Sequence, residues 1–377
     1  MGNMNNLDFG DLLLKGARDP MDGGIWQPHE SPLIRGLVEK WTNLGINKFG
    51  ALQSELVKWI DHGQHKPGPQ IAQPSIAWGR WTPGEVKTVK LYLESLPPEA
   101  FTVDDWLLVV DYLFQRYLPL DVMMTDAEML AVRSSIMGKV AANVENLSEA
   151  KASKIADAAP FQVVAANRLF PGMTAAQRAT LAYGKARCCE LVVQLSENAR
   201  MDMRKLIVDW QSQVALGGEN APRESLQSRL LDKFGMINRD WRRIAITEAG
   251  ENMNQGMIAS LPVGTVVQRI EQYRGACPFC KKWDGAKLTV VSPDKAKKNP
   301  DTEVWAGKTN VGRSSSPMKQ SGTGLVPRTT DELWQPTAGL FHPHCRGRWL
   351  VISSPDDPIN LPDEHYLAWL RGQLAKG

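Results

Sequence analysis

The amino-acid sequence predicts an α+β fold, mostly α, in which a large helical body precedes a small β-containing domain near the C-terminus. Apolar residues recur at helical spacing over most of the chain before about residue 260, and residues that cap helices often precede these stretches. After Leu261, short β-branched runs replace this pattern. The length of 377 residues also exceeds the roughly 250–300 residues at which a single hydrophobic core stops growing, so we expect more than one domain.

The first predicted region, residues 1–84, combines a small helical part with an arm. Residues 31–61 carry an apolar stripe at helical spacing, which we expect to break near Gly45. Residues 62–84 are rich in Gly, Pro, Gln and Ser, a composition typical of a linker or an extended arm.

Residues 85–260 are predicted to form the helical body. In a capping box, a Thr hydroxyl and a later Glu, Asp or Gln side chain satisfy the free N–H groups of the first helical turn. The sequence offers four such boxes, Thr82–Glu85, Thr102–Asp105, Thr125–Glu128 and Thr174–Gln177. A long helix is expected within 174–215, and two separate helices over 225–234 and 240–260.

The last predicted regions are a domain over 261–352 and a C-terminal tail over 353–377. Strands are expected at 263–270, 287–291 and 349–352, where β-branched and aromatic residues gather between turn signals.

Charge and cysteine content exclude several classes of protein. The chain has 44 Lys and Arg against 41 Asp and Glu, and a net charge of +3 is too even to predict nucleic-acid binding from bulk charge. We expect no membrane association, because no stretch approaches the about 20 apolar residues of a membrane span and the N-terminus lacks a secretory pattern. Five cysteines do not indicate a disulfide framework, and Cys188 and Cys189 are interpreted as small core or surface residues.

Two Cys/His pairs with the same spacing predict a metal site. Cys277 and Cys280 are separated by two residues, and so are His342 and Cys345. Three thiolates and one imidazole complete the tetrahedral shell that zinc prefers, and a shell closed by protein ligands is structural rather than catalytic. His344 is the alternative histidine ligand, because either imidazole could reach.

A redox role for Cys277 and Cys280 competes with the metal site. Redox pairs of this spacing stand at the start of a helix, which lowers the thiol pKa. Residues 281–285 are expected to lead into a turn instead, which favours the metal.

These residues resemble the phage Mu-type head-morphogenesis (minor head protein) family over roughly residues 175–352. The resemblance rests on a strand followed by Cys277 and Cys280, then Asp284-Gly285, then His342-Pro343-His344-Cys345-Arg346. The helix 241–248, with Asn254 and Gly256 after it, is similar to the family's helix bearing a Thr-Glu pair. The family often has a further Cys where this chain has Gly347, which removes one candidate ligand.

The resemblance implies a structural virion component rather than an enzyme. It implies a minor head protein inside or near the portal vertex, made in the host cytoplasm, that contacts the portal or major capsid protein and aids head assembly and genome packaging or delivery. We expect no catalytic activity, because phosphate-loop, nucleophile-elbow and zinc-protease motifs are absent from the sequence. Thr247-Glu248 is interpreted as a solvated face or an interhelical contact.

The alternatives are a zinc-stabilised DNA-binding protein and an HNH-like nuclease. The nuclease is disfavoured, because residues 281–341 contain no histidine for its active site. Residues 292–330 carry seven basic and three acidic side chains, a local charge of +4, and are expected to form an exposed excursion that does not fold alone. That loop is a candidate for weak, unselective contact with DNA phosphates through Lys295, Lys297, Lys298 and Arg313.

Overall fold

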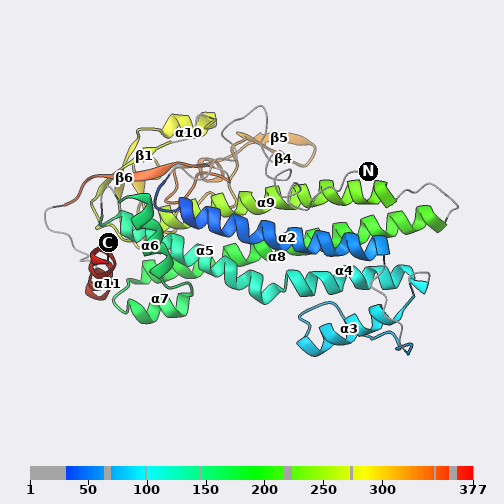
Figure 1. Ribbon diagram of the computed structural model, residues 1–377. Helices are drawn as coiled ribbons and strands as arrows, with labels where there is room; N and C mark the ends of the chain where they lie inside the picture. The colour runs from blue at the N-terminus through cyan, green and yellow to red at the C-terminus, as the bar shows by residue number, and fades with distance from the viewer. Residues whose placement is uncertain are drawn as a thin grey trace. The chain divides into compact units, whose positions relative to one another are not determined.

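The computed structural model describes residues 31–62, 69–97, 100–144, 147–215, 223–271, 275–343, 345–355 and 363–376 (Figure 1). These residues are mostly helical, with a small sheet region near the C-terminus, which confirms the predicted α+β class. Among the described helices, none is both long and apolar enough to cross a membrane.

The helices are α2 (Arg35–His62), α3 (Pro83–Ser95), α4 (Val103–Tyr117), α5 (Leu120–Ala141), α6 (Glu149–Ala158), α7 (Val163–Leu169), α8 (Ala175–Ala215), α9 (Arg223–Ile258), α10 (Pro278–Trp283) and α11 (Glu364–Ala375). The strands are β1 (Val266–Ile270), β2 (Lys287–Val290), β3 (Glu303–Val304), β4 (Met318–Ser321), β5 (Gly324–Pro327) and β6 (Arg348–Ser353).

The chain divides into two compact units that are discontinuous in sequence. The described part of the first unit comprises Thr42–Asp126 and Cys189–Arg242. The described part of the second comprises residues 31–41, Ala127–Cys188 and Arg243–Gly377 up to residue 376. The four consecutive regions expected from the sequence do not share their boundaries with these two units. The predicted 261–352 domain lies wholly within the second unit.

In the first unit, the expected break of α2 at Gly45 is wrong. The helix continues through this residue, because the missing side chain makes room for the Trp241 indole, which a Cβ at position 45 would overlap. Phe49, one turn later, packs edge-on against the same indole at 5.6 Å. The glycine therefore marks a close approach between helices rather than a helix end.

Three of the four predicted capping boxes are confirmed, at Thr82, Thr102 and Thr174. The box at Thr125 is wrong, because α5 begins earlier, directly after Pro119. The Thr125 hydroxyl donates to the Asp121 carbonyl one turn back, as Thr does inside a helix.

The expected division of residues 225–260 into two helices is also wrong, because α9 is continuous. Gly235 lies mid-helix, where glycine costs only about 1 kcal/mol relative to alanine. Phe234 and Ile237 on either side of it are buried, and this packing outweighs the weak local propensity.

The second unit contains a four-stranded sheet in the order β3-β2-β1-β6. Strand β1 is central and antiparallel to both β2 and β6, whereas β2 and β3 are parallel. The strands predicted at 263–270, 287–291 and 349–352 are confirmed as β1, β2 and β6, with boundaries shifted by a few residues. Their apolar faces pack against Met257 and Ile258 at the end of α9 and against Leu261, which follows the helix.

The 292–330 segment, predicted to be an exposed excursion that does not fold alone, is largely exposed, and it also contributes β3 to this sheet and forms the hairpin β4–β5. Val304 is buried in the core under the sheet, and so is Lys308 beside it. The Lys308 ammonium donates to the carbonyls of Pro300 and Glu303, at 2.6 and 2.8 Å, and so replaces the water that these groups would otherwise bind. The other described residues of this segment are exposed or half-buried, as expected.

Part of the predicted C-terminal tail forms α11. Its N-cap is Asp363, whose carboxylate accepts from the His365 N–H. Tyr366 is buried and packs edge-on against Phe170 at 5.5 Å. This aromatic contact fixes the helix on the second unit.

Helices α5 and α9 approach each other backbone to backbone in the second unit. A Cβ at Gly138 would overlap the Met253 carbonyl oxygen, and a Cβ at Gly256 would overlap the Ser135 carbonyl oxygen. Both glycines therefore serve close packing between two helices and not a turn.

Replacing Gly138 with alanine should lower the free energy of unfolding by about 1–3 kcal/mol, because the added methyl forces α5 and α9 apart. Urea unfolding checks this. Gly235→Ala is the matched control, because a Cβ there meets no atom within 4 Å, and it should be neutral or stabilising by up to about 1 kcal/mol. Equal effects of the two changes would contradict the close approach.

Candidate metal centre

The four predicted ligands lie together in the second unit although 61 residues separate the two pairs. The His342 Nε2 atom lies 3.2 Å from the Cys277 Sγ and 3.0 Å from the Cys280 Sγ. The Cys280 and Cys345 sulfurs are 3.6 Å apart. Cys280 therefore stands at the middle of the cluster, within reach of every other donor.

The first pair is held at the start of α10. Cys277 is the N-cap residue, and its sulfur accepts from the Cys280 N–H at 3.5 Å. Pro278 occupies the first helical position, where its missing N–H costs nothing. The expectation that residues 281–285 lead into a turn instead of a helix is wrong, because Cys277 caps a six-residue helix and the turn begins only at Asp284. Gly285 then adopts a φ of 78°, which few other residues adopt.

His342 is oriented by its neighbours. Its Nδ1 lies 2.7 Å from the Pro343 carbonyl, which can only accept, so Nδ1 carries the proton and Nε2 presents a lone pair to the sulfurs. The Trp334 ring stacks on the imidazole at 5.2 Å with an angle of 16°. Metal-binding histidines are fixed in the same way, by a hydrogen bond from the ring nitrogen that does not bind the metal.

Sequence reasoning missed a fifth donor, Glu271. This carboxylate forms a second group with Cys280 and Cys345, and its nearer oxygen lies 3.6 Å from the Cys345 sulfur. Glu271 directly follows the last residue of β1, which pairs with Arg348, so the sheet places it beside the start of β6. The signal in the sequence was an acidic residue at the end of a buried strand six positions before Cys277.

A buried arginine supplies positive charge next to this second group. Arg269 is fully buried and donates to Glu271 at 3.1 Å and to the Cys345 sulfur at 3.2 Å. The Cys280 contact, together with the charge of Arg269, holds the pKa of Cys345 well below its usual range. Contact with Cys345 and burial raise the pKa of Cys280, so the two thiols do not ionise together easily without a cation.

The donor set fits a metal ion. In a tetrahedral zinc shell with Zn–S bonds of about 2.3 Å, two sulfurs lie about 3.8 Å apart and a sulfur and a nitrogen about 3.5 Å apart. The three separations given above are shorter than these values, and the donors form two groups of three that share Cys280, each with all its donor atoms within 4.8 Å of one another. Cys277, Cys280, His342, Cys345 and Glu271 could therefore hold a metal ion. His344, the alternative ligand, lies outside the described residues.

Helix α9 ties this centre to the helical part of the second unit. The Glu251 carboxylate accepts from the Leu340 N–H at 2.6 Å. The Asn254 amide donates to the Gly347 carbonyl at 2.8 Å. These two bonds fix the backbone on both sides of His342 and Cys345.

The expected solvated face at Thr247-Glu248 is wrong, and the interhelical contact is confirmed. Both residues are buried, and Glu248 accepts from Arg187 of α8 at 3.0 Å. A charged pair in this position was not recognisable from the sequence, because its partner lies 61 positions away.

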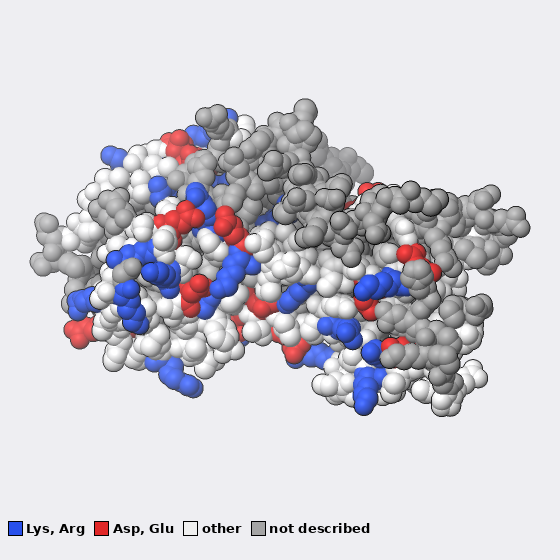
Figure 2. All heavy atoms as spheres, in the orientation of Figure 1, with Lys and Arg blue, Asp and Glu red and all other residues white. Residues whose placement is uncertain are grey.

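The four basic residues predicted to contact DNA lie in the second unit, and three of them contact other groups of the chain. Lys295 pairs with Glu303, Lys298 lies over a tryptophan ring at 5.2 Å, and Arg313 donates to two backbone carbonyls. Lys297 is exposed. On the face shown in Figure 2, basic and acidic side chains of the described residues lie interleaved. DNA contact stays a prediction.

Comparisons with family models, with curated proteins and with solved structures gave no match.

The Glu248 carboxylate should make stability depend on pH. Burial raises its pKa to about 7 in spite of the Arg187 charge, so the folded state holds this proton more tightly than the unfolded state. The stability of the wild type relative to Glu248→Gln should therefore fall between pH 4.5 and 7, by up to about 3 kcal/mol. Urea unfolding of both proteins at pH 5 and pH 8 measures this difference.

The control is Glu364→Gln, at an exposed position of α11, which should follow the wild-type pH dependence. A difference between wild type and Glu248→Gln that stays constant over this range would contradict the assignment.

Proposed function

We propose that this chain is a structural minor head protein of a tailed phage, with a zinc ion closing the centre in its second unit. It would be made in the host cytoplasm and incorporated into the virion, inside the head or near the portal vertex. There it would contact the portal or major capsid protein and aid head assembly and genome packaging or delivery.

One observation supports this proposal above the others. The segments whose residues resemble the head-morphogenesis family form a single assembly: Glu251 and Asn254 of α9 bind the backbone beside His342 and Cys345. These in turn meet the cysteines of α10. If the resemblance were due to chance, there would be no reason for motif segments far apart in the sequence to contact one another.

The proposed ligands of the zinc ion are Cys277, Cys280, His342 and Cys345. Bound there, the ion would cross-link α10 to the segment that precedes β6. Four protein ligands leave no open coordination position, so the role is structural. The buried Glu271 would stay beside Cys345 as a partner of Arg269.

Purified protein should contain about one equivalent of Zn²⁺. Cys280→Ser should lose this metal and much stability in the second unit, because the binding free energy of a structural ion contributes to folding. Metal analysis by mass spectrometry and thermal unfolding with and without a chelator measure both effects.

Cys188→Ala is the matched control, since Cys188 lies on α8 outside the cluster and should leave the zinc content unchanged. The metal assignment would be overturned if wild-type protein contained far less than one equivalent of zinc, or if Cys280→Ser kept full stability. Neither result would contradict the virion assignment.

The virion assignment is tested by mass spectrometry of purified particles of the phage that encodes this chain. We expect peptides of the chain at a low copy number relative to the major capsid protein, and particles lacking it should be defective in assembly or in DNA content. Absence from particles, or plasmid cleavage by the purified protein, would favour the DNA-binding or nuclease alternatives.

A further inference from the structure

Arg269 is a fully buried cation on β1 whose hydrogen bonds end beside the candidate metal centre. Its Nε donates to the Glu271 carboxylate and its Nη1 to the Gly339 carbonyl, each at 3.1 Å. Its Nη2 donates to the Cys345 sulfur at 3.2 Å. One guanidinium therefore joins a carboxylate, a backbone carbonyl and a proposed metal ligand.

The position of this guanidinium is fixed by its surroundings. It lies over the Phe341 ring at 4.1 Å and over the Trp349 ring at 5.3 Å. A Cβ at position 347 would overlap the Nη2 atom, so the glycine at this position leaves room for the guanidinium. The packing therefore holds this N–H group against the Cys345 sulfur.

The chemistry of the contact favours a thiolate at Cys345. A thiol sulfur is only a weak acceptor, whereas an ionised acceptor forms a charge-assisted hydrogen bond of roughly twice the strength. The thiolate is also the form of cysteine that binds a metal ion. The contact with Arg269 therefore stabilises Cys345 in the state that a ligand must have.

The loaded centre would be stabilised by the same charge. A zinc ion has two positive charges and three thiolates have three negative ones, so a centre completed by a neutral imidazole carries a net charge of −1. Burying such a charge costs free energy unless a partner compensates it, and Cys345 is only 3% exposed. Arg269 supplies compensating charge at a sulfur that water does not reach.

Cys277 shows the contrast between the two ends of the centre. Its sulfur accepts from a neutral group, the Cys280 N–H, at the longer distance of 3.5 Å, and the residue is only partly buried. Cys345 combines burial with a charged donor at 3.2 Å. Hydrogen bonds to ligand sulfurs tune the properties of metal sites, so Arg269 acts on the Cys345 end of the centre.

We propose that Arg269 strengthens metal binding through its hydrogen bond to the metal-bound thiolate of Cys345, while Glu271 orients its guanidinium. Arg269 is not a ligand itself, because it acts on the ion through the sulfur. The inference rests on the proposed metal centre and does not rest on the virion role.

The test uses the full-length protein, freed of metal with a chelator and titrated with Co²⁺. Cobalt bound by thiolates has a sulfur-to-metal charge-transfer band, which moves to longer wavelength when a sulfur loses a hydrogen bond and holds its electrons less tightly. Arg269→Gln should shift the band in this direction. It should also lower the affinity for Zn²⁺, measured by competition with a chelating dye, by about 10–100-fold. Arg269→Lys keeps the charge and should recover part of that affinity.

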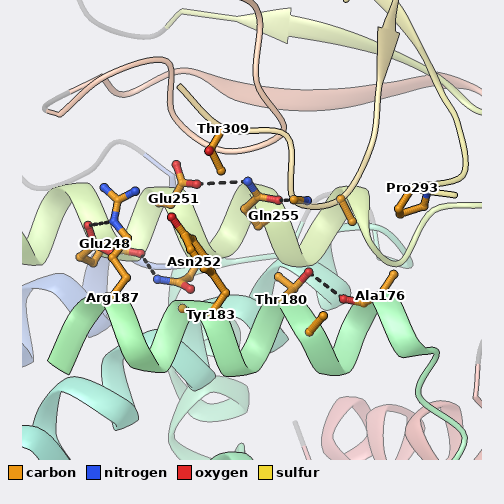
Figure 3. Close-up of a pocket in the computed structure, with 14 residues that line it drawn as sticks. Ala176, Thr180, Tyr183, Arg187, Glu248, Glu251, Asn252, Gln255, Pro293 and Thr309 are labelled. Carbon is orange, nitrogen blue, oxygen red and sulfur yellow. Dashed lines mark hydrogen bonds and ion pairs between the residues drawn. The ribbon is translucent and has the colours of Figure 1, made fainter. Parts of the chain in front are cut away.

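Arg187→Gln is the matched control. Figure 3 shows Arg187 of α8 directed at Glu248 of α9, with which it forms a buried pair at 3.0 Å in the same unit. Arg187 lies outside both donor groups of the metal centre. Its replacement should lower stability, because it leaves a buried carboxylate without its partner, and should leave the cobalt band and the Zn²⁺ affinity unchanged.

If Arg269→Gln does not fold, Gly347→Ala decides, because the added Cβ forces the guanidinium away from the sulfur and should shift the band in the same direction. An unchanged band and affinity in Arg269→Gln, or equal changes in Arg187→Gln, would overturn the role of Arg269 and leave the metal centre standing. Wild-type protein that takes up neither Co²⁺ nor Zn²⁺ would overturn both.

Discussion

The hydrogen bond from the Leu340 N–H to the buried carboxylate of Glu251 is the contact on which the second unit depends. It brings an irregular segment against α9 so closely that a Cβ at Gly339 would overlap the same carboxylate. Residues 335–341 are buried without regular secondary structure, so their backbone groups need partners from elsewhere. Burial raises the pKa of Glu251, and this desolvation cost is offset by nearby guanidinium groups and by the two hydrogen bonds that the carboxylate accepts.

The same face of α9 organises the rest of the unit. Within two helical turns, Glu248 binds α8, Glu251 and Asn254 bind the segment beside the cysteines, and Gln255 binds the backbone at 307 and 308. Residues three and four apart share a helix face, so this spacing lets one helix hold three segments far apart in sequence. The metal centre and the ion pair between α8 and α9 are therefore supported by the same face of one helix, although they use different side chains.

Local signals in the sequence predicted local structure well. Capping boxes, β-branched runs and the Cys/His spacing predicted α3, α4, α8, the central strands and the four sulfur and nitrogen donors. The predictions that were wrong depended on partners distant in the sequence. Gly45 suggests a helix break in the sequence, and only the structure shows that the Trp241 indole occupies the space of its missing side chain. Likewise, Glu271 becomes a donor only because β1 and β6 pair and so place it beside Cys345. No local pattern encodes these contacts.

Helix α9 supports one half of the metal centre. The two halves come from α10 and from the segment after Phe341, which is bound on both sides by α9, at Leu340 and Gly347. Arg269 then places its charge against Cys345, with its guanidinium stacked on the Phe341 ring at 4.1 Å. A metal ion would thus bind a site assembled by buried hydrogen bonds and would cross-link segments that already touch. Its binding free energy would add to the folding of the whole unit and not only to that of the loop that carries the ligands.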